Sequence, residues 1–172
     1  MISTDTAIIV RHIKLRDNSK IIWVFSRDRG RYALMVHGAY SRKISPYIRL
    51  LNKIEFSTYK KGNFISLHSI SKSYDFIIID KLINQTLSLY IANIICKIVP
   101  EQYKSETVYD YIESVLHTLS EKSCPLQSAI DIQQKFLEII ISDLGISTSE
   151  EVSFHKLIEE ELGYSVWNPF NK

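Results

Sequence analysis

The chain has 172 residues, of which 45% are hydrophobic and 23% are charged, with only five glycines and four prolines. These values are typical of a folded protein and exclude a disordered or low-complexity chain. The net charge of +2 hides an uneven distribution: residues 1–81 hold 15 basic and 6 acidic side chains (+9), whereas residues 82–172 hold 6 and 13 (−7). The basic half predicts a polyanionic partner, and a chance difference between two charged surfaces is the competing explanation.

The cysteines and the apolar segments indicate the compartment. Cys96 and Cys124 are far apart and have neither CxxC nor metal-ligand spacing. They predict two free thiols in a reducing compartment, with no metal and no cofactor. The N-terminus has no basic segment followed by an apolar run, so no signal peptide is predicted. The longest apolar stretch, residues 83–99, is interrupted by Asn84, Gln85, Asn93 and Lys97 and indicates a buried helix rather than a membrane span. We expect a cytoplasmic protein.

Five short strands are predicted in the first half, at residues 6–15, 21–26, 31–37, 50–59 and 64–70. They are rich in β-branched and aromatic residues, and turn-forming segments at 16–20, 27–30 and 60–63 separate them. In the third strand, Tyr32, Leu34 and Val36 share one face. Five consecutive strands without a long intervening helix favour a small antiparallel barrel. The OB-fold, a five-stranded Greek-key barrel that often binds oligonucleotides, fits best.

The hydrophobic period changes around residues 71–75, and the rest of the chain predicts helices. A long helix covers residues 77–99 and ends at Pro100, a second is capped by Ser105, and a third begins at 123–125 and ends at Gly145. A capping box at residues 147–150 predicts a last, acidic helix ending near residue 163. The expected fold is therefore α+β, with an OB-fold β-barrel domain at residues 1–75 and a helical domain at residues 76–172.

Basic and aromatic side chains are interleaved in the first half, as expected for a surface that binds nucleic acid. Cations neutralise phosphates, and aromatic rings stack on bases at roughly 1–3 kcal/mol per base. Tyr40 and Tyr47, in a predicted loop, are the stacking candidates, whereas Trp23, Phe25 and Phe56 are expected in the barrel core. The candidate DNA-binding residues are Arg11, Lys14, Arg16, Lys20, Arg27, Arg29, Arg31, Tyr40, Arg42, Lys43, Tyr47, Arg49 and Lys53.

Catalytic motifs are missing from the sequence. The five histidines are scattered without HExxH spacing, and neither a GxSxG motif nor a glycine-rich phosphate loop is present. Three consecutive glutamates at residues 159–161 are expected on a solvated helix face. We therefore expect no enzymatic activity. A nuclease on the same barrel is the alternative, and it would need clustered carboxylates, for which Asp5, Asp17 and Asp28 are the early candidates.

The first half resembles a known protein family. The matching segments are TAIIVR at residues 6–11, DNSKII at 17–22 and RGRYALMVHGAYSRK at 29–43. They resemble the bacterial RecO recombination-mediator family, which opens with a similar strand, a turn like ENSKI, and a strand between GR and a basic glycine-led loop. The resemblance covers residues 1–75 and continues more loosely through residues 109–145.

The resemblance implies an OB-fold that binds single- and double-stranded DNA, followed by a helical domain that contacts partners. Family members anneal strands coated with single-strand-binding protein and act with RecR to help load RecA, without catalysis. The chain is shorter than typical members and lacks the four-cysteine zinc motif that many carry, so either the function persists without zinc or the C-terminal part has diverged. A protein-interaction adaptor is the second hypothesis: the helical domain would dock the single-strand-binding protein tail near Lys97, Lys104 or Lys135.

Overall fold

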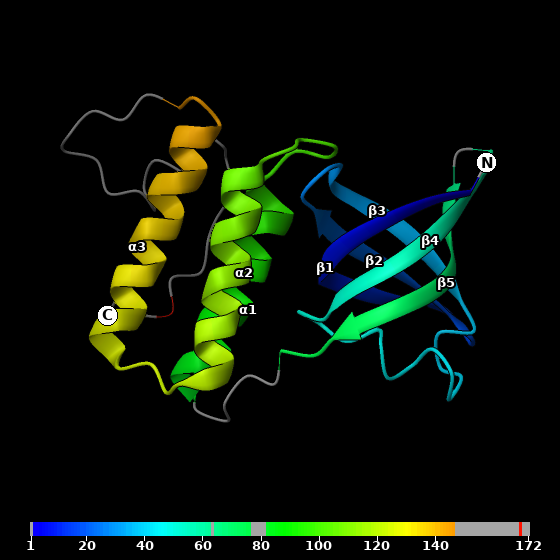
Figure 1. Cartoon of the computed structure of the whole chain (residues 1–172), viewed down its shortest axis with the longest axis horizontal. Coiled ribbons are helices and arrows are strands. Elements are labelled where there is room, and N and C mark those ends of the chain that lie inside the picture. The colour runs from blue at the N-terminus through cyan, green and yellow to red at the C-terminus, as the bar shows by residue number, and fades with distance from the viewer. Residues whose placement is uncertain (1, 63, 77–81, 147–168, 170–172) are drawn as a thin grey trace. The chain divides into compact units, whose positions relative to one another are not determined.

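The computed structural model describes residues 2–62, 64–76, 82–146 and 169. The chain divides into two compact units, shown in Figure 1. One unit contains Met1–Phe76 together with Glu101–Lys104, and the other contains Ile77–Pro100 and Ser105–Lys172. The predicted division placed all residues after 75 in the helical domain. The difference lies in the short segment 101–104, which returns to the barrel unit.

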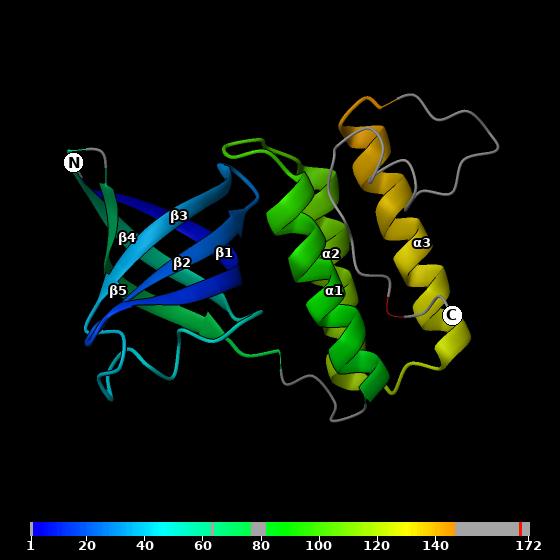
Figure 2. The same ribbon diagram turned by 180° about the vertical axis from the view of Figure 1, so that it is seen from behind.

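Five strands form the barrel unit: β1 (Ile2–Arg16), β2 (Ser19–Ser26), β3 (Gly30–His37), β4 (Lys53–Lys61) and β5 (Phe64–Tyr74). They close in the order β1-β2-β3-β5-β4, with β3 parallel to β5 and all other pairs antiparallel. Figure 2 shows the barrel from behind. This architecture confirms the predicted OB-fold, and its closure leaves no long unpaired sheet edge.

Three strand boundaries differ from the prediction by three residues or more. Strand β1 begins at Ile2 rather than residue 6, because its first part pairs with β4 and its second part with β2. Strand β4 begins at Lys53 rather than residue 50, because Leu51 has a φ of 69° and ends a turn. Strand β5 continues to Tyr74 rather than ending at residue 70. Two register shifts in the β4–β5 ladder interrupt the alternation that marks a strand in sequence.

The barrel core forms from alternate residues of the strands, as their pleat requires. Tyr32, Leu34 and Val36 share one face as predicted, and that face is buried together with Ile22, Val24, Ile54 and Phe56 from neighbouring strands. Trp23, which was expected in the core, is only half-buried and lies outside this cluster. Trp23 alternates with Ile22 and Val24, so the strand's pleat turns it away from the core.

The segment 101–104 completes the barrel unit at the start of β3. The Gln102 N–H donates to the Arg31 carbonyl at 2.8 Å, and Glu101 forms a β-bridge with Arg31. Gly30 has a φ of +70°, and a Cβ added there would lie 2.1 Å from the Tyr103 carbonyl oxygen. Only a glycine therefore permits this backbone approach.

The helical unit contains α1 (Leu82–Ile98), α2 (Glu106–Glu121) and α3 (Leu126–Asp143). The predicted cap of α2 is confirmed, because the Ser105 hydroxyl accepts the Val108 N–H at 3.1 Å. Buried Asn84 on α1 forms hydrogen bonds with the end of α2 and with the segment between α2 and α3. Its amide donates to the Leu119 and Lys122 carbonyls, and its side-chain oxygen accepts the Cys124 N–H, each at 2.9 Å.

The predicted end of α3 is also confirmed. Gly145 has a φ of +70°, and the Ile146 N–H donates to the Ile141 carbonyl across the helix terminus at 3.1 Å. The predicted capping box at residues 147–150, the acidic helix after it and the aromatic residues at 164, 167 and 170 lie outside the described residues. Within the described part of the chain, no helix combines the length and the apolar character needed to cross a membrane.

Candidate nucleic-acid interface

The loop between β3 and β4, residues 38–52, is packed into the barrel by its apolar side chains. Ala39 and Ile48 belong to the buried barrel core, and Ile44 packs against it. The Ala39 N–H also donates to the Asn18 carbonyl at 3.2 Å. These contacts fix the loop backbone, while the side chains of Tyr40, Arg42, Lys43 and Tyr47 are exposed.

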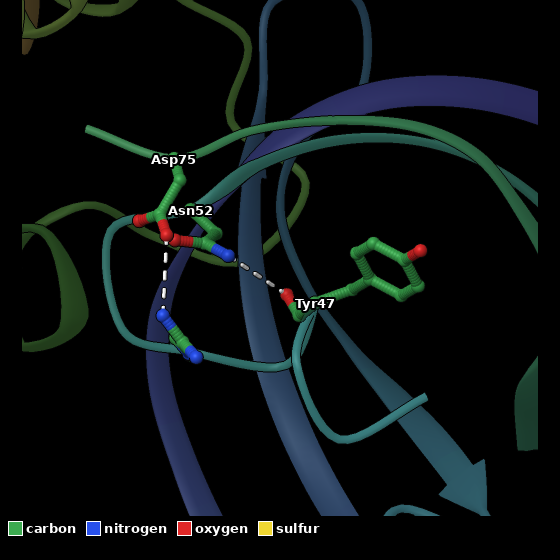
Figure 3. Close-up of polar contacts among 4 residues, drawn as sticks. Tyr47, Asn52 and Asp75 are labelled. Carbon is green, nitrogen blue, oxygen red and sulfur yellow. Dashed lines mark hydrogen bonds and ion pairs between the residues drawn. The ribbon is translucent and has the colours of Figure 1, made fainter. Parts of the chain in front are cut away.

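A second set of hydrogen bonds fixes the end of this loop. The Leu51 N–H donates to the Ile9 carbonyl at 2.7 Å, and the Ile9 N–H donates to the Asn52 carbonyl at 2.9 Å. The buried Asn52 amide donates to the Tyr47 carbonyl at 3.2 Å (Figure 3). In the same view the Tyr47 ring points away from Asn52. The backbone of Tyr47 is thus held while its ring is left exposed.

Four of the predicted binding residues form what we call the loop face: Tyr40, Arg42, Lys43 and Tyr47, all exposed. Arg42 and Lys43 make no ion pair or hydrogen bond with any described residue. Arg49, on the same loop, differs because its Nη1 lies 3.2 Å from Asp75 Oδ2. Two cations and two aromatic rings on a fixed loop provide the two groups that single-stranded nucleic acid needs.

Three other predicted cations lie over aromatic rings of the barrel unit. Lys20 Nζ is 4.9 Å from the centroid of the Tyr40 ring, and Arg11 Cζ is 5.0 Å from that of Trp23. Lys53 Nζ is 5.5 Å from the centroid of Tyr74. Such cation–π contacts hold each charge at a defined place on the surface. Lys20 thereby extends the loop face to β2.

The predicted cations at the start of β3 have different surroundings, and we call Arg27, Arg29 and Arg31 the hairpin end. The Arg31 side chain is only 13% exposed, and its Nη1 lies 3.9 Å from Glu101 Oε1. Arg29 is half-buried with its Cζ 4.5 Å from the centroid of the Tyr32 ring. Arg27 is exposed. The guanidinium groups of Arg29 and Arg31 are therefore engaged within the barrel unit.

A polar cluster around Asp5 holds the hairpin end in place. Ser26 Oγ donates to Asp5 Oδ1 at 2.7 Å, and the Tyr32 hydroxyl donates to Asp5 Oδ2. Ser26 Oγ also accepts the backbone N–H groups of Asp28 and Arg29 at 3.2 and 3.3 Å. Burial, and after it the bond to Asp5, raises the pKa of Tyr32, so its hydroxyl remains a donor. Asp5, which lies on β1, thus stabilises the β2–β3 turn through Ser26 and Tyr32.

The remaining predicted site residues are less informative. Lys14 is exposed on β1, and the Arg16 side chain lies outside the described part. Of the carboxylates considered for a nuclease, Asp5 is occupied as above, and Asp17 lies in the β1–β2 turn. Among the described residues, no group of three or more His, Cys, Asp or Glu side chains is placed to hold a metal ion.

The four-cysteine zinc site of the resembled family does not fit this chain. The sequence has two cysteines, half-buried Cys96 on α1 and buried Cys124 before α3. Burial, and after it the charge of Asp131, raises the pKa of the Cys124 thiol and opposes the thiolate form that binds zinc. The three lysines considered for partner docking are also divided, since Lys104 belongs to the barrel unit and Lys135 Nζ lies 3.5 Å from Glu138.

A hollow of about 400 Å³ adjoins the loop face and was not predicted from the sequence. Lys43 and Tyr47 of the loop line it together with His37 of β3, Tyr59 of β4 and His68 of β5. Tyr59 and His68 make an edge contact, with ring centroids 6.2 Å apart. The alternation of residues along a strand indicates which face of the sheet a side chain lies on, but not which side chains of other strands lie near it. Only the strand order, which places β5 between β3 and β4, brings them together.

Comparison with known proteins identifies one domain. Residues 1–74 match the family model described as Recombination protein O N terminal. The matched span includes β1 to β5 and the whole loop face, but not the segment 101–104. No curated protein matched the chain.

Proposed function

We propose that this chain binds single-stranded DNA through the loop face and anneals complementary strands, because residues 1–74 match the N-terminal domain of the RecO family of DNA repair and recombination proteins. One observation carries the proposal. Arg42 and Lys43 are exposed beside two aromatic rings, on a loop fixed to the barrel, and have no partner among the described residues. Free cations on a fixed backbone bind phosphates without first breaking an internal ion pair.

The neighbouring cations extend the binding track. Lys20 lies over Tyr40, and Arg11 over Trp23, so both charges remain at the barrel surface. Lys14 on β1 is exposed between them in sequence. Binding that relies on phosphate contacts and a few stacked rings leaves most base edges free to pair. Annealing of two complementary strands is consistent with this mode of binding.

The proposed cellular role follows from the family. We propose a non-enzymatic mediator that acts with RecR and single-strand-binding protein to help load RecA, and that also binds double-stranded DNA. Asp5 supports the non-enzymatic reading, because its two oxygens accept bonds from Ser26 and Tyr32. A carboxylate engaged in this way is poorly suited to carry a catalytic metal.

Equilibrium binding to a labelled single strand across salt concentrations tests the proposal. In Arg42→Ala/Lys43→Ala, we expect roughly tenfold weaker binding and a salt dependence shallower by about 1.4 in log–log slope, since each phosphate contact contributes about 0.7. The free energy of unfolding should change by less than about 0.5 kcal/mol, because both side chains are exposed. A complementary-strand annealing assay should show a matching loss of rate.

A matched control removes two charges elsewhere. Lys122 and Lys135 are exposed in the helical unit, so Lys122→Ala/Lys135→Ala lowers the net charge equally without changing the loop face. We expect near wild-type binding from this variant. Equal losses from both variants would show that overall charge, rather than the loop face, controls affinity. Failure of the folded wild-type protein to bind DNA at low salt would overturn the proposal.

A further inference from the structure

We propose that the hollow beside the loop face holds one unstacked base of the bound single strand, an inference that rests on the proposed function. Four aromatic side chains, His37, Tyr47, Tyr59 and His68, line this hollow with Lys43. The residues come from the β3–β4 loop and from three strands that are separated in sequence. DNA would therefore be held by a base as well as by its phosphates.

The size and lining of the hollow fit a planar heterocycle. Its volume of about 400 Å³ lies near the lower end of the range of roughly 300–1,000 Å³ for small-molecule sites. Ile44, Leu67 and Ile70 contribute apolar surface, and Ser41 contributes a hydroxyl. Apolar and aromatic walls with a few polar groups are the environment in which an unstacked base is bound by stacking and by hydrogen bonds to its edge.

Lys43 connects this hollow to the phosphate track. It is exposed on the loop face and also lines the hollow. A base in the hollow would therefore place its own phosphate near the loop cations, as the short sugar linkage requires. The charge favours a nucleotide of a polyanionic strand over an uncharged aromatic compound.

The walls of the hollow are fixed before any ligand binds. The Asn52 amide holds the Tyr47 carbonyl, and the Tyr47 N–H donates to the Ile44 carbonyl at 3.0 Å. Ser69, which also lines the hollow, shares a 2.7 Å hydrogen bond through its Oγ with Ser57 Oγ of β4. A preformed site lowers the ordering cost of binding. The Tyr47 side chain, exposed on its held backbone, provides the stacking surface.

Photo-crosslinking with a single strand containing 5-iodouracil tests the proposal in the full-length protein. Ultraviolet light joins this base to an aromatic side chain that it contacts, and mass spectrometry of the digested protein identifies the residue. We expect crosslinks at one or more of the aromatic side chains that line the hollow, which are His37, Tyr47, Tyr59 and His68. Crosslinks confined to other residues, such as Tyr40 or Trp23, would overturn the proposal even if DNA binding is strong.

Affinity measurements supply a second readout. Tyr47→Ala should bind oligothymidylate at least about fivefold more weakly, the lower end of the range for loss of one base–aromatic stack. Tyr47→Phe keeps the ring and should remain within about twofold of wild type. On an abasic strand with the same phosphates, Tyr47→Ala and wild type should bind equally.

The outcomes separate this inference from the proposed function. Suppose that Arg42→Ala/Lys43→Ala weakens binding, whereas Tyr47→Ala and Tyr47→Phe bind oligothymidylate equally. The hollow then binds no base, and the proposed binding of phosphates by Arg42 and Lys43 is kept. If Tyr47→Ala weakens binding equally on the abasic strand, its ring supports the loop rather than a base. If wild type binds neither strand, the proposed function itself fails.

Discussion

Arg29 and Arg31 at the start of β3 resemble Arg42 and Lys43 just beyond its end in charge, and both pairs follow or flank a glycine, but their surroundings differ. Arg31 is 13% exposed and lies beside Glu101, and Arg29 lies over Tyr32. Arg42 and Lys43 are exposed on a loop whose apolar residues are packed inward. The comparison shows that basic residues at the hairpin end contribute to packing, whereas those on the loop face are available for a ligand.

The largest expected change in the free energy of unfolding comes from replacing one of the two glycines at the ends of β3. Gly30→Ala should lower the free energy of unfolding by more than about 3 kcal/mol, because its Cβ would collide with the Tyr103 backbone in a strained conformation. Gly38→Ala has a similar φ of +65° but only Ser41 Oγ nearby, at 3.9 Å, and should lose about 1–2 kcal/mol. Urea denaturation measures both. Equal losses would mean that the segment 101–104 does not pack closely on the hairpin end.

A smaller loss of stability is expected from the polar cluster at the hairpin end. Asp5→Ala leaves the Ser26 and Tyr32 hydroxyls without their acceptor and should cost about 1–3 kcal/mol. Asp5→Asn retains one acceptor oxygen and should cost less. The folded Asp5→Ala protein should bind single-stranded DNA within about twofold of wild type, as measured by fluorescence anisotropy. Loss of DNA cleavage in this variant, if wild type cleaves DNA, would favour the nuclease alternative.

The ion pair at the hairpin end provides a third test. In a double-mutant cycle of Arg31→Ala and Glu101→Ala, we expect a coupling energy below about 1 kcal/mol, because Glu101 is 62% exposed. The more informative result is the DNA affinity of Arg31→Ala, which should stay within about twofold of wild type. A tenfold loss would place Arg31 in the binding track and erase the distinction between the two ends of β3.

The smallest effect concerns His12 on β1, whose imidazole is affected by the charge of Lys20. Burial, and after it the charge of Lys20, lowers the pKa of His12 below its ordinary value of 6.5. The unfolded chain therefore takes up this proton at higher pH than the folded chain, and stability present above about pH 6.5 falls as the solution is acidified. In His12→Gln, the difference in urea midpoint between about pH 7.5 and about pH 5.5 should narrow. An unchanged difference would show that His12 is fully solvated.

Local patterns predicted much of the fold but less of the site. The alternation of Tyr32, Leu34 and Val36 identified the core face of β3, and Ser105 and Gly145 identified two helix ends, because these signals depend on near neighbours in sequence. The register shifts in β5 and the positive φ of Leu51 concealed two strand boundaries. Tyr40, Arg42, Lys43 and Tyr47, predicted to bind DNA, are exposed because a loop between strands lies on the surface, and their contact with DNA stays a prediction.

Residues far apart in sequence account for what was missed. The contact of Arg31 with Glu101 depends on a segment beyond α1, and no local pattern distinguishes an ion-paired arginine from a free one. Similarly, His37, Tyr59 and His68 line one hollow only because β5 lies between β3 and β4. The charge distribution along the sequence identifies the basic half of the chain. Which of its cations are engaged in contacts within the protein depends on the tertiary structure.

The return of residues 101–104 to the barrel unit affects how the chain folds during its synthesis. All five strands are synthesised before this segment, yet Gly30 and Arg31 make backbone contacts with it. The barrel therefore acquires its last contacts only after α1, residues 82–98, has also been synthesised. A fragment that ends at residue 76 contains every strand but lacks these contacts, and it should unfold at a lower temperature than the barrel within the full chain.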